Sequence, residues 1–245
     1  MTRKWKVLMI LAAVGVGAVV ALILAGPALQ RSFFYPKPHG LPLVVSQSVE
    51  QLLAHLQSAL DTNVPAVAQV LQPGLAETQI SALEVQGGFR LPGDLRALYR
   101  WHNGMATNTP LGLLPGQRFL SLEECVGERV IMRQQTGAAP SAQRAAFSLF
   151  AGHRKSWVHV FDDGAGDGYF YDPERTEANG AFFYYMAEGG YYVWFPSFRN
   201  FLSGVIECYE SRCVRLSADG KSLDADGPQM ERIWQRLAKT SESGG

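Results

Sequence analysis

Residues 91–104 read LPGDLRALYRWHNG, and this stretch decides the fold more than any other part of the 245-residue chain. Pro92 suits the first turn of a helix, where a missing N–H costs nothing. Leu98 and Tyr99 lie on one apolar face of that helix, at helical spacing. The pair at 103–104, Asn-Gly, favours the left-handed conformation that ends a helix. The stretch therefore predicts a short amphipathic helix with a defined start and stop.

Helical patterns also flank this stretch on both sides. Ser48 and Gln51 form a capping box, and Ser121 and Glu124 form another, so each pair predicts the N-terminus of a helix. Apolar residues recur at helical spacing behind these caps and in two segments between them. The predicted helices cover residues 49–60, 66–71, 77–85 and about 121–132.

The second half of the chain changes to short β-prone runs separated by Gly, Asp and Asn, which is typical of an antiparallel meander. The predicted strands are 147–151, 157–161, 169–172, 181–187 and 191–195. Ser197 then caps a helix, and a last amphipathic helix at 229–239 follows a polar stretch. We therefore predict an α+β fold in which an antiparallel sheet of about five strands packs with helices.

The N-terminus predicts a membrane segment. Three basic residues precede residues 7–29, a run of 23 residues without a charge. A helix of that length spans ~34 Å, enough to cross the hydrocarbon core, with its basic side in the cytoplasm. We expect a single-pass anchor in the cytoplasmic membrane, in contact with the bilayer through 7–29, and a globular domain on the extracytoplasmic side. A cleaved signal peptide, with Gly26-Pro27-Ala28 as its small-residue site, is the alternative.

These patterns divide the chain into four parts. Residues 1–29 are the anchor or signal peptide, 30–46 a Pro-rich linker, 47–213 the main domain, and 214–245 a C-terminal extension with a helix and a frayed tail. Only three of the 22 basic residues and none of the 22 acidic residues lie in 1–29, so the remainder is weakly acidic. Such a domain has no long-range attraction for phosphate backbones, which argues against nucleic-acid binding.

The stretch 91–104 resembles the LPxDLxxLYxxxNG element of the SUKH superfamily, the group that contains the fungal Smi/Knr regulators of cell-wall assembly. Further matches follow in the order of the family: a Leu-Ser-Leu-Glu-Glu helix at 120–124, a Gly-Asp turn at 166–167, and a Ser-Phe-x-x-Phe-Leu helix at 197–202. The resemblance covers about residues 48–210 and thus makes 47–213 a SUKH-like domain. The matching motif positions are Leu91, Pro92, Leu98, Tyr99, Asn103, Gly104, Gly166, Asp167 and Asp172.

The resemblance implies a non-enzymatic, protein-binding role. Bacterial members look like immunity proteins that neutralise toxins from neighbouring cells, and fungal relatives act as regulatory scaffolds. The leading hypothesis is therefore a membrane-anchored protein-binding module of the immunity type, directed against a toxin that acts on the envelope. A scaffold for cell-wall or envelope assembly is the first alternative. A metal-dependent hydrolase that uses an acidic loop is the second.

The acidic loop is residues 162–168, DDGAGDG. Oxygen ligands on a glycine-rich loop suit calcium, but the spacing departs from that of the EF-hand, and Asp and Gly also shape ordinary strand connections. The sequence has no nucleophile–base pair and no ligand set with convincing metal spacing. We therefore predict no catalytic residue, no metal and no cofactor.

Residues 181–195 contain eight aromatic side chains, and alternation along the strands places them on both faces of the sheet. They are either buried or offered in part to a partner. Acids beside Tyr and Trp are typical of a protein-binding site, and their sign favours a partner with a basic surface. The candidate partner-binding residues are Asp162, Asp163, Asp167, Tyr184, Tyr192 and Trp194.

Three cysteines are present, and Cys208 and Cys213 form a possible disulfide in an oxidising compartment, with Cys125 left over. On one continuous helix, two residues five apart point away from each other. The disulfide therefore requires the helix to end before Cys213.

Overall fold

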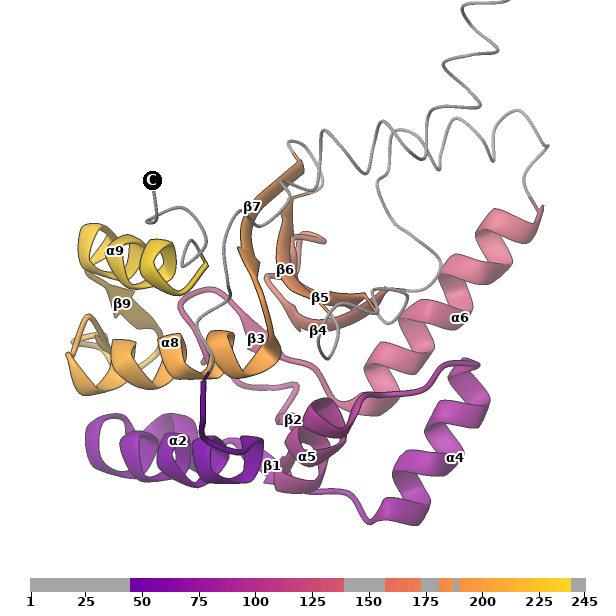
Figure 1. Ribbon diagram of the computed structural model, residues 1–245, viewed down its shortest axis with the longest axis horizontal. Coiled ribbons are helices and arrows are strands. Elements are labelled where there is room, and N and C mark those ends of the chain that lie inside the picture. The colour runs from indigo at the N-terminus through magenta and orange to yellow at the C-terminus, as the bar shows by residue number, and fades with distance from the viewer. Residues whose placement is uncertain (1–44, 139–156, 173–180, 187–189, 239–245) are drawn as a thin grey trace, which may run out of the picture. The chain divides into compact units, whose positions relative to one another are not determined.

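The computed structural model describes residues 45–138, 157–172, 181–186 and 190–238, which lie in one compact unit (Figure 1). The predicted anchor at 7–29, most of the linker and the predicted strand at 147–151 lie outside the described residues. Among the helices in the described ranges, none is both long and apolar enough to span a bilayer.

The N-terminal half of the described chain is mostly helical, as predicted. Its elements are α2 (Val49–Asn63), α3 (Pro65–Gln69), β1 (Leu71–Pro73), α4 (Glu77–Gly87), α5 (Gly93–Trp101) and β2 (His102–Met105). The capping box of Ser48 and Gln51 is confirmed at the start of α2. Strands β1 and β2 pair antiparallel, and neither was predicted, because three or four residues are too few to establish an alternating pattern.

The predicted helix stop at Asn103-Gly104 is wrong. Helix α5 ends at Trp101, and His102 adopts an extended conformation that leads directly into β2. Gly104 does have a left-handed backbone, with φ of 76°, but it lies inside the strand. Asn103 and Gly104 instead contact the residues that begin the next long helix, at Ser121 and Leu122, and the sequence does not reveal this contact.

The antiparallel sheet of five strands is confirmed, in the order β3-β4-β5-β6-β7. Its strands are β3 (Arg118–Phe119), β4 (Val158–Asp162), β5 (Gly168–Asp172), β6 (Ala181–Met186) and β7 (Gly190–Phe195). One edge strand was not predicted, because β3 lies in a stretch without an alternating apolar pattern. The register places the acidic loop between β4 and β5, with Asp162 opposite both Gly168 and Arg118.

The remaining elements surround the sheet. They are α6 (Leu122–Ala138), α8 (Phe198–Glu210), β8 (Val214–Leu216), β9 (Leu223–Ala225) and α9 (Gly227–Ala238). Helix α6 continues six residues beyond the predicted end at 132. The polar stretch after α8, for which no strand was predicted, contains the β8–β9 hairpin. Figure 1 shows α2, α8 and α9 side by side, in agreement with their contacts.

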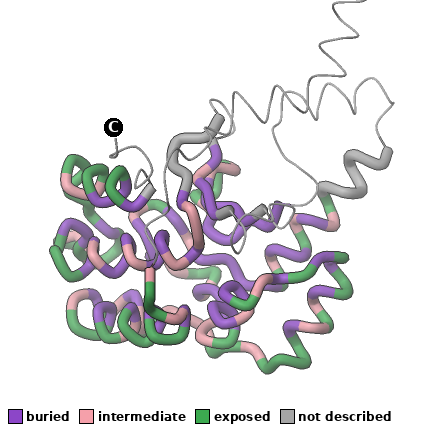
Figure 2. The backbone as a smooth tube through the Cα atoms, viewed as in Figure 1, coloured by how far each residue is buried: buried purple, intermediate pink, exposed green. Residues whose placement is uncertain are grey.

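Aromatic rings occupy both faces of the sheet, as expected from alternation. On one face, the ring of Phe201 in α8 lies against Phe161, Tyr169 and Phe182. The opposite face carries a second cluster of buried rings, which consists of Trp157, Phe170, Phe183 and Tyr185. The described parts of the strands are accordingly almost all buried (Figure 2).

Helix α9 also contributes to the main core. Its Trp234 stacks on Phe201 with ring centroids 6.0 Å apart and meets Phe195 edge-on at 5.3 Å. Burial of a large aromatic side chain is worth several kcal/mol, so the last helix is an integral part of the packing.

Candidate partner-binding site

The end of the motif stretch docks the N-terminus of α6. The side-chain oxygen of Asn103 accepts the backbone N–H of Leu122 at 2.8 Å, and its amide donates to Glu123 at 2.7 Å. Gly104 lies so close that a Cβ there would be 2.4 Å from the backbone nitrogen of Ser121. Asn-Gly at this point therefore caps and seats a second helix, which explains the two residue types better than a helix stop does.

The other motif positions are structural in a similar way. Leu91 and Leu98 are buried, and the Leu91 N–H donates to the buried carboxylate of Glu84 at 2.8 Å. Pro92 is the N-cap of α5. Gly166 lies in the acidic loop with a φ of 96°, which favours glycine. Asp172 ends β5, and its side chain lies outside the described residues.

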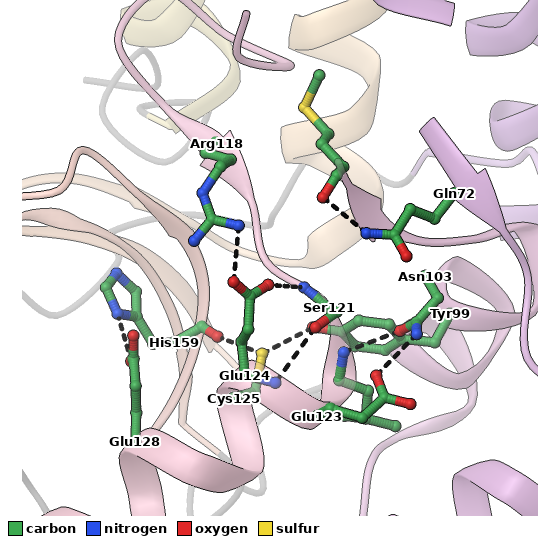
Figure 3. A network of polar contacts seen from close by, with 12 residues as sticks. Gln72, Tyr99, Asn103, Arg118, Ser121, Glu123, Glu124, Cys125, Glu128 and His159 are labelled. Atoms are coloured by element: carbon green, nitrogen blue, oxygen red, sulfur yellow. Dashed lines mark hydrogen bonds and ion pairs between the residues drawn. The ribbon is translucent and has the colours of Figure 1, made fainter. Parts of the chain in front are cut away.

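A chain of buried hydrogen bonds ties α5 to α6 and β4 (Figure 3). The Cys125 thiol donates to the backbone oxygen of His159 at 2.8 Å, so the Tyr99 hydroxyl, 3.1 Å from the sulfur, donates to Cys125. Burial is the main cause that raises the pKa of both the Tyr99 hydroxyl and the Cys125 thiol. Both groups are therefore neutral and enclosed, which suits a structural role and not that of a nucleophile.

The capping box of Ser121 and Glu124 at the start of α6 is confirmed. The Glu124 carboxylate accepts the Ser121 N–H at 2.8 Å, and the Ser121 hydroxyl accepts the Glu124 N–H at 3.2 Å. The same carboxylate pairs with Arg118 at 2.8 Å (Figure 3). Helix α6 and the edge strand β3 are thus fixed to each other by one carboxylate.

One turn further along α6, Glu128 reaches the imidazole of His159. Nδ1 of His159 lies 2.9 Å from the Glu128 carboxylate and must carry the proton, because the carboxylate only accepts. The ring stacks on Phe170 at 4.1 Å. Nε2 is buried and has no hydrogen-bond partner among the described residues, and the nearest acid, Asp162, is 3.9 Å away. His159 therefore donates a hydrogen bond to Glu128 of α6, while its second ring nitrogen faces Asp162 without a hydrogen bond.

Asp163 shapes the acidic loop itself. Its Oδ1 accepts the backbone N–H groups of Ala165 and Asp167 at 2.8 and 3.0 Å. The backbone N–H of Asp163 in turn donates to the backbone oxygen of Asp167 at 3.0 Å. This arrangement is the ordinary turn chemistry of Asp. Within the described ranges, no group of three or more His, Cys, Asp or Glu residues is placed to hold a metal ion.

These contacts join α6, β3 and the acidic loop into one negatively charged surface. We call it the acidic face and define it as Glu124, Glu128, Asp162, Asp163 and Asp167. Its side chains differ in accessibility: Glu128 is 45% exposed and Glu124 28%, whereas Asp162 is 17% exposed. Arg118 compensates part of the charge through its ion pair with Glu124. Among the described residues a surplus of negative charge remains, on side chains held by helix, strand and turn.

Tyr184 lies near Asp163 and Asp167 of the acidic loop, on the side of the sheet that faces α8. Its ring is half-buried and contacts Tyr169 at 5.0 Å. Burial, and after it the carboxylates of Asp167 and Asp163, raises the pKa of Tyr184. The structure therefore brings one predicted aromatic residue and the predicted acids together. Tyr192 and Trp194 belong to β7, and their side chains lie outside the described residues.

Sequence reasoning missed Glu124 and Glu128 as members of this surface, as well as His159. Glu124 was recognised only as a helix cap, and no role was predicted for His159. The spacing of Glu124 and Glu128 by four residues predicts a shared helix face. That this face turns toward the acidic loop depends on the docking of α6 by Asn103, which the sequence does not reveal.

Residues 74–204 match the SMI1/KNR4 family (SUKH-1). The matched segment spans α4 to the middle of α8 and includes the motif stretch and the acidic face. The chain therefore belongs to the SMI1/KNR4 (SUKH-1) family. No curated protein matches it.

Proposed function

We propose that this chain is a membrane-anchored, non-enzymatic protein-binding module, of the immunity type found among bacterial relatives, and that the acidic face with Tyr184 contacts a basic protein surface. The observation that carries the proposal is the acidic face itself. Glu124 pairs with Arg118, Glu128 and Asp162 lie on either side of the His159 imidazole, and Asp163 and Asp167 lie near the half-buried Tyr184. Charge of one sign on rigid elements steers association with the opposite sign, and an adjacent aromatic ring supplies desolvated contact.

A binding role without catalysis is supported by the state of the polar groups in this region. Tyr99 and Cys125 are enclosed, with pKa values raised by burial, and Asp163 holds two backbone amides. Asp163 would be central to a metal-dependent hydrolase, so its engagement in the turn favours binding over hydrolysis. Family membership points in the same direction.

The proposed location is the extracytoplasmic side of the cytoplasmic membrane, held by residues 7–29. It rests on the uncharged run of 23 residues behind a basic start. A module in this location binds a protein that reaches the envelope. Protease added to spheroplasts should then digest the domain, and a mature chain that begins near residue 29 would instead mean a cleaved signal peptide.

The binding proposal is tested by comparative capture with full-length protein in detergent. Glu128→Gln, Asp162→Asn and Asp163→Asn together remove three charges. Each amide keeps a carbonyl oxygen, so the Asp163 turn and the acceptor for His159 are retained. A protein captured by the wild type and lost with this variant supports the proposal.

A matched control removes three exposed charges elsewhere, by Asp61→Asn, Asp224→Asn and Glu231→Gln. Capture should survive these changes. Equal capture by the wild type and both variants would reject the acidic face as the binding site. A captured cell-wall synthesis protein in place of a toxin would favour the scaffold alternative.

A further inference from the structure

The chain reverses direction at the end of α8. The helix ends at Glu210, and Arg212 follows with a φ of 58°, the only positive φ of a non-glycine residue in the described part of the chain. The backbone N–H of Arg212 donates to the backbone oxygen of Tyr209 at 3.1 Å. This is one of the two hydrogen bonds of a Schellman ending, in which the residue after the left-handed position folds back onto the last turn of the helix.

That folded-back residue is Cys213, and the position that it meets in such an ending is Cys208. Both thiols are buried in the main core, and burial, and after it the neighbouring Cys213, raises the pKa of the Cys208 thiol. The condition set by the sequence, that the helix end before Cys213, is therefore fulfilled by Arg212. A left-handed residue between the two cysteines gives them the approach that a continuous helix would prevent.

We infer that Cys208 and Cys213 form a disulfide when the chain folds in an oxidising compartment; the inference rests on the extracytoplasmic location proposed above. The structure describes the reduced form, in which all three cysteines are free. The oxidant is a disulfide of a small thiol or of a thiol oxidase. One cysteine thiolate attacks it and releases one thiol, and the second cysteine displaces the other. The pair loses two electrons and two protons, and the oxidant becomes two thiols.

Bond formation must accompany folding, because burial raises the pKa of the Cys208 thiol and keeps it protonated and enclosed in the folded chain. The bond would fix the C-terminal segment to α8. Cys213 precedes β8, and its backbone oxygen accepts the N–H of Asp226, whose side chain accepts the N–H of Gln229 at the start of α9. The two cysteines therefore lie where the β8–β9 hairpin and α9 join the main core.

Two arms test the inference with the full-length chain. In the first, cells are quenched in acid, free thiols are blocked with N-ethylmaleimide under denaturing conditions, and the remaining thiols are reduced and labelled with a second reagent. In the second, detergent-solubilised protein is reduced, unfolded and refolded with oxidised and reduced glutathione. Mass spectrometry then assigns each label to Cys125, Cys208 or Cys213. Cys125→Ala repeats both arms with the pair alone.

The expected result is the second label on Cys208 and Cys213 in both arms, with Cys125 blocked by the first reagent. A pair that closes on refolding but is open in cells supports the disulfide site and overturns the extracytoplasmic location. A pair that stays open on refolding overturns the inference whatever the location. A bond from Cys125 to either partner overturns it as well.

Discussion

The motif stretch at 91–104 and the acidic face are joined through α6, yet they use their side chains in opposite ways. Leu98, Tyr99 and Asn103 of the motif stretch are buried, and each contributes to packing or to a hydrogen bond within the fold. Glu128 of the acidic face is 45% exposed, and its charge remains available beyond its contact with His159. The motif stretch therefore determines where α6 lies, whereas the acidic face uses that position to present charge.

This difference has a consequence for sequence change. A substitution at a buried position of the motif stretch removes a buried hydrogen bond or creates a clash, which costs several kcal/mol. A substitution of an exposed carboxylate usually costs about 0.5 kcal/mol or less. We therefore expect the two regions to separate cleanly in experiments, one by stability and the other by binding.

The largest effect on stability is expected at Gly104. A Cβ there would lie 2.4 Å from the Ser121 nitrogen, and the φ of 76° is strained for any other residue. Gly104→Ala should lower the free energy of unfolding by about 3 kcal/mol or more in a denaturant titration. Gly93→Ala is the matched control, because no atom lies within 4 Å of its Cβ position. Equal loss in both variants would mean that the docking of α6 is not specific.

The second largest effect is expected at Asp94. Its two oxygens accept from Nε and Nη2 of Arg199, each at 2.9 Å, and so connect α5 to α8 in a bidentate pair. Asp94 is buried, so Asp94→Asn should destabilise by about 2 kcal/mol. Glu50→Gln is the control, because Glu50 is exposed and 3.8 Å from Arg100, and it should cost less than about 0.5 kcal/mol. Thermal unfolding that ranks the two variants the other way would contradict this account of the motif stretch.

A smaller effect is expected at His159, which connects the two regions. Its backbone oxygen accepts the Cys125 thiol, and its Nδ1–H donates to Glu128. His159→Phe keeps the stack on Phe170 and the backbone contact but loses the hydrogen bond to Glu128, at a cost of about 1 kcal/mol. Hydrogen exchange of the amides around Glu128 in α6 should accelerate, while those of α5 stay protected. Unchanged exchange at these amides would show that the hydrogen bond does not hold this part of α6.

The smallest effect concerns pH and His102. Burial, the largest cause, lowers the pKa of His102 below its value in the unfolded chain. The unfolded state therefore binds more protons as the pH falls below about 6.5, and stability falls with it. Because the ring is only half-buried, the loss attributable to His102 between pH 7 and 5 should be under about 1 kcal/mol. His102→Gln should flatten that part of the stability profile, and an unchanged slope would contradict the assignment.

The sequence predicted the elements that carry strong local signals. The capping boxes at Ser48 and Ser121 are confirmed, as are the hydrophobic runs that form β4 to β7. Strand β3 was missed because its two residues, Arg118 and Phe119, show no alternation. The β8–β9 hairpin was missed because its strands are only three residues long, which is too short to establish an alternating pattern.

The site was predictable only in part for a different reason. The acidic loop is one continuous segment, so its charge could be read directly from the residues. Glu124 and Glu128 join it only because Asn103 and Gly104 seat α6 against the sheet. Contacts between segments far apart in the chain have no local signature. From the local sequence alone, Asn103 and Gly104 were predicted to end α5, and that prediction is wrong.

The association rate of the captured partner tests the central claim most directly. It is measured across salt concentrations for the wild type, for Glu128→Gln/Asp162→Asn/Asp163→Asn, and for the control Asp61→Asn/Asp224→Asn/Glu231→Gln. Loss of three steering charges should slow association by about tenfold at low salt and flatten its salt dependence, with little change in the melting temperature. The control should associate like the wild type. Equal rates and salt slopes for all three proteins would contradict a basic partner on the acidic face.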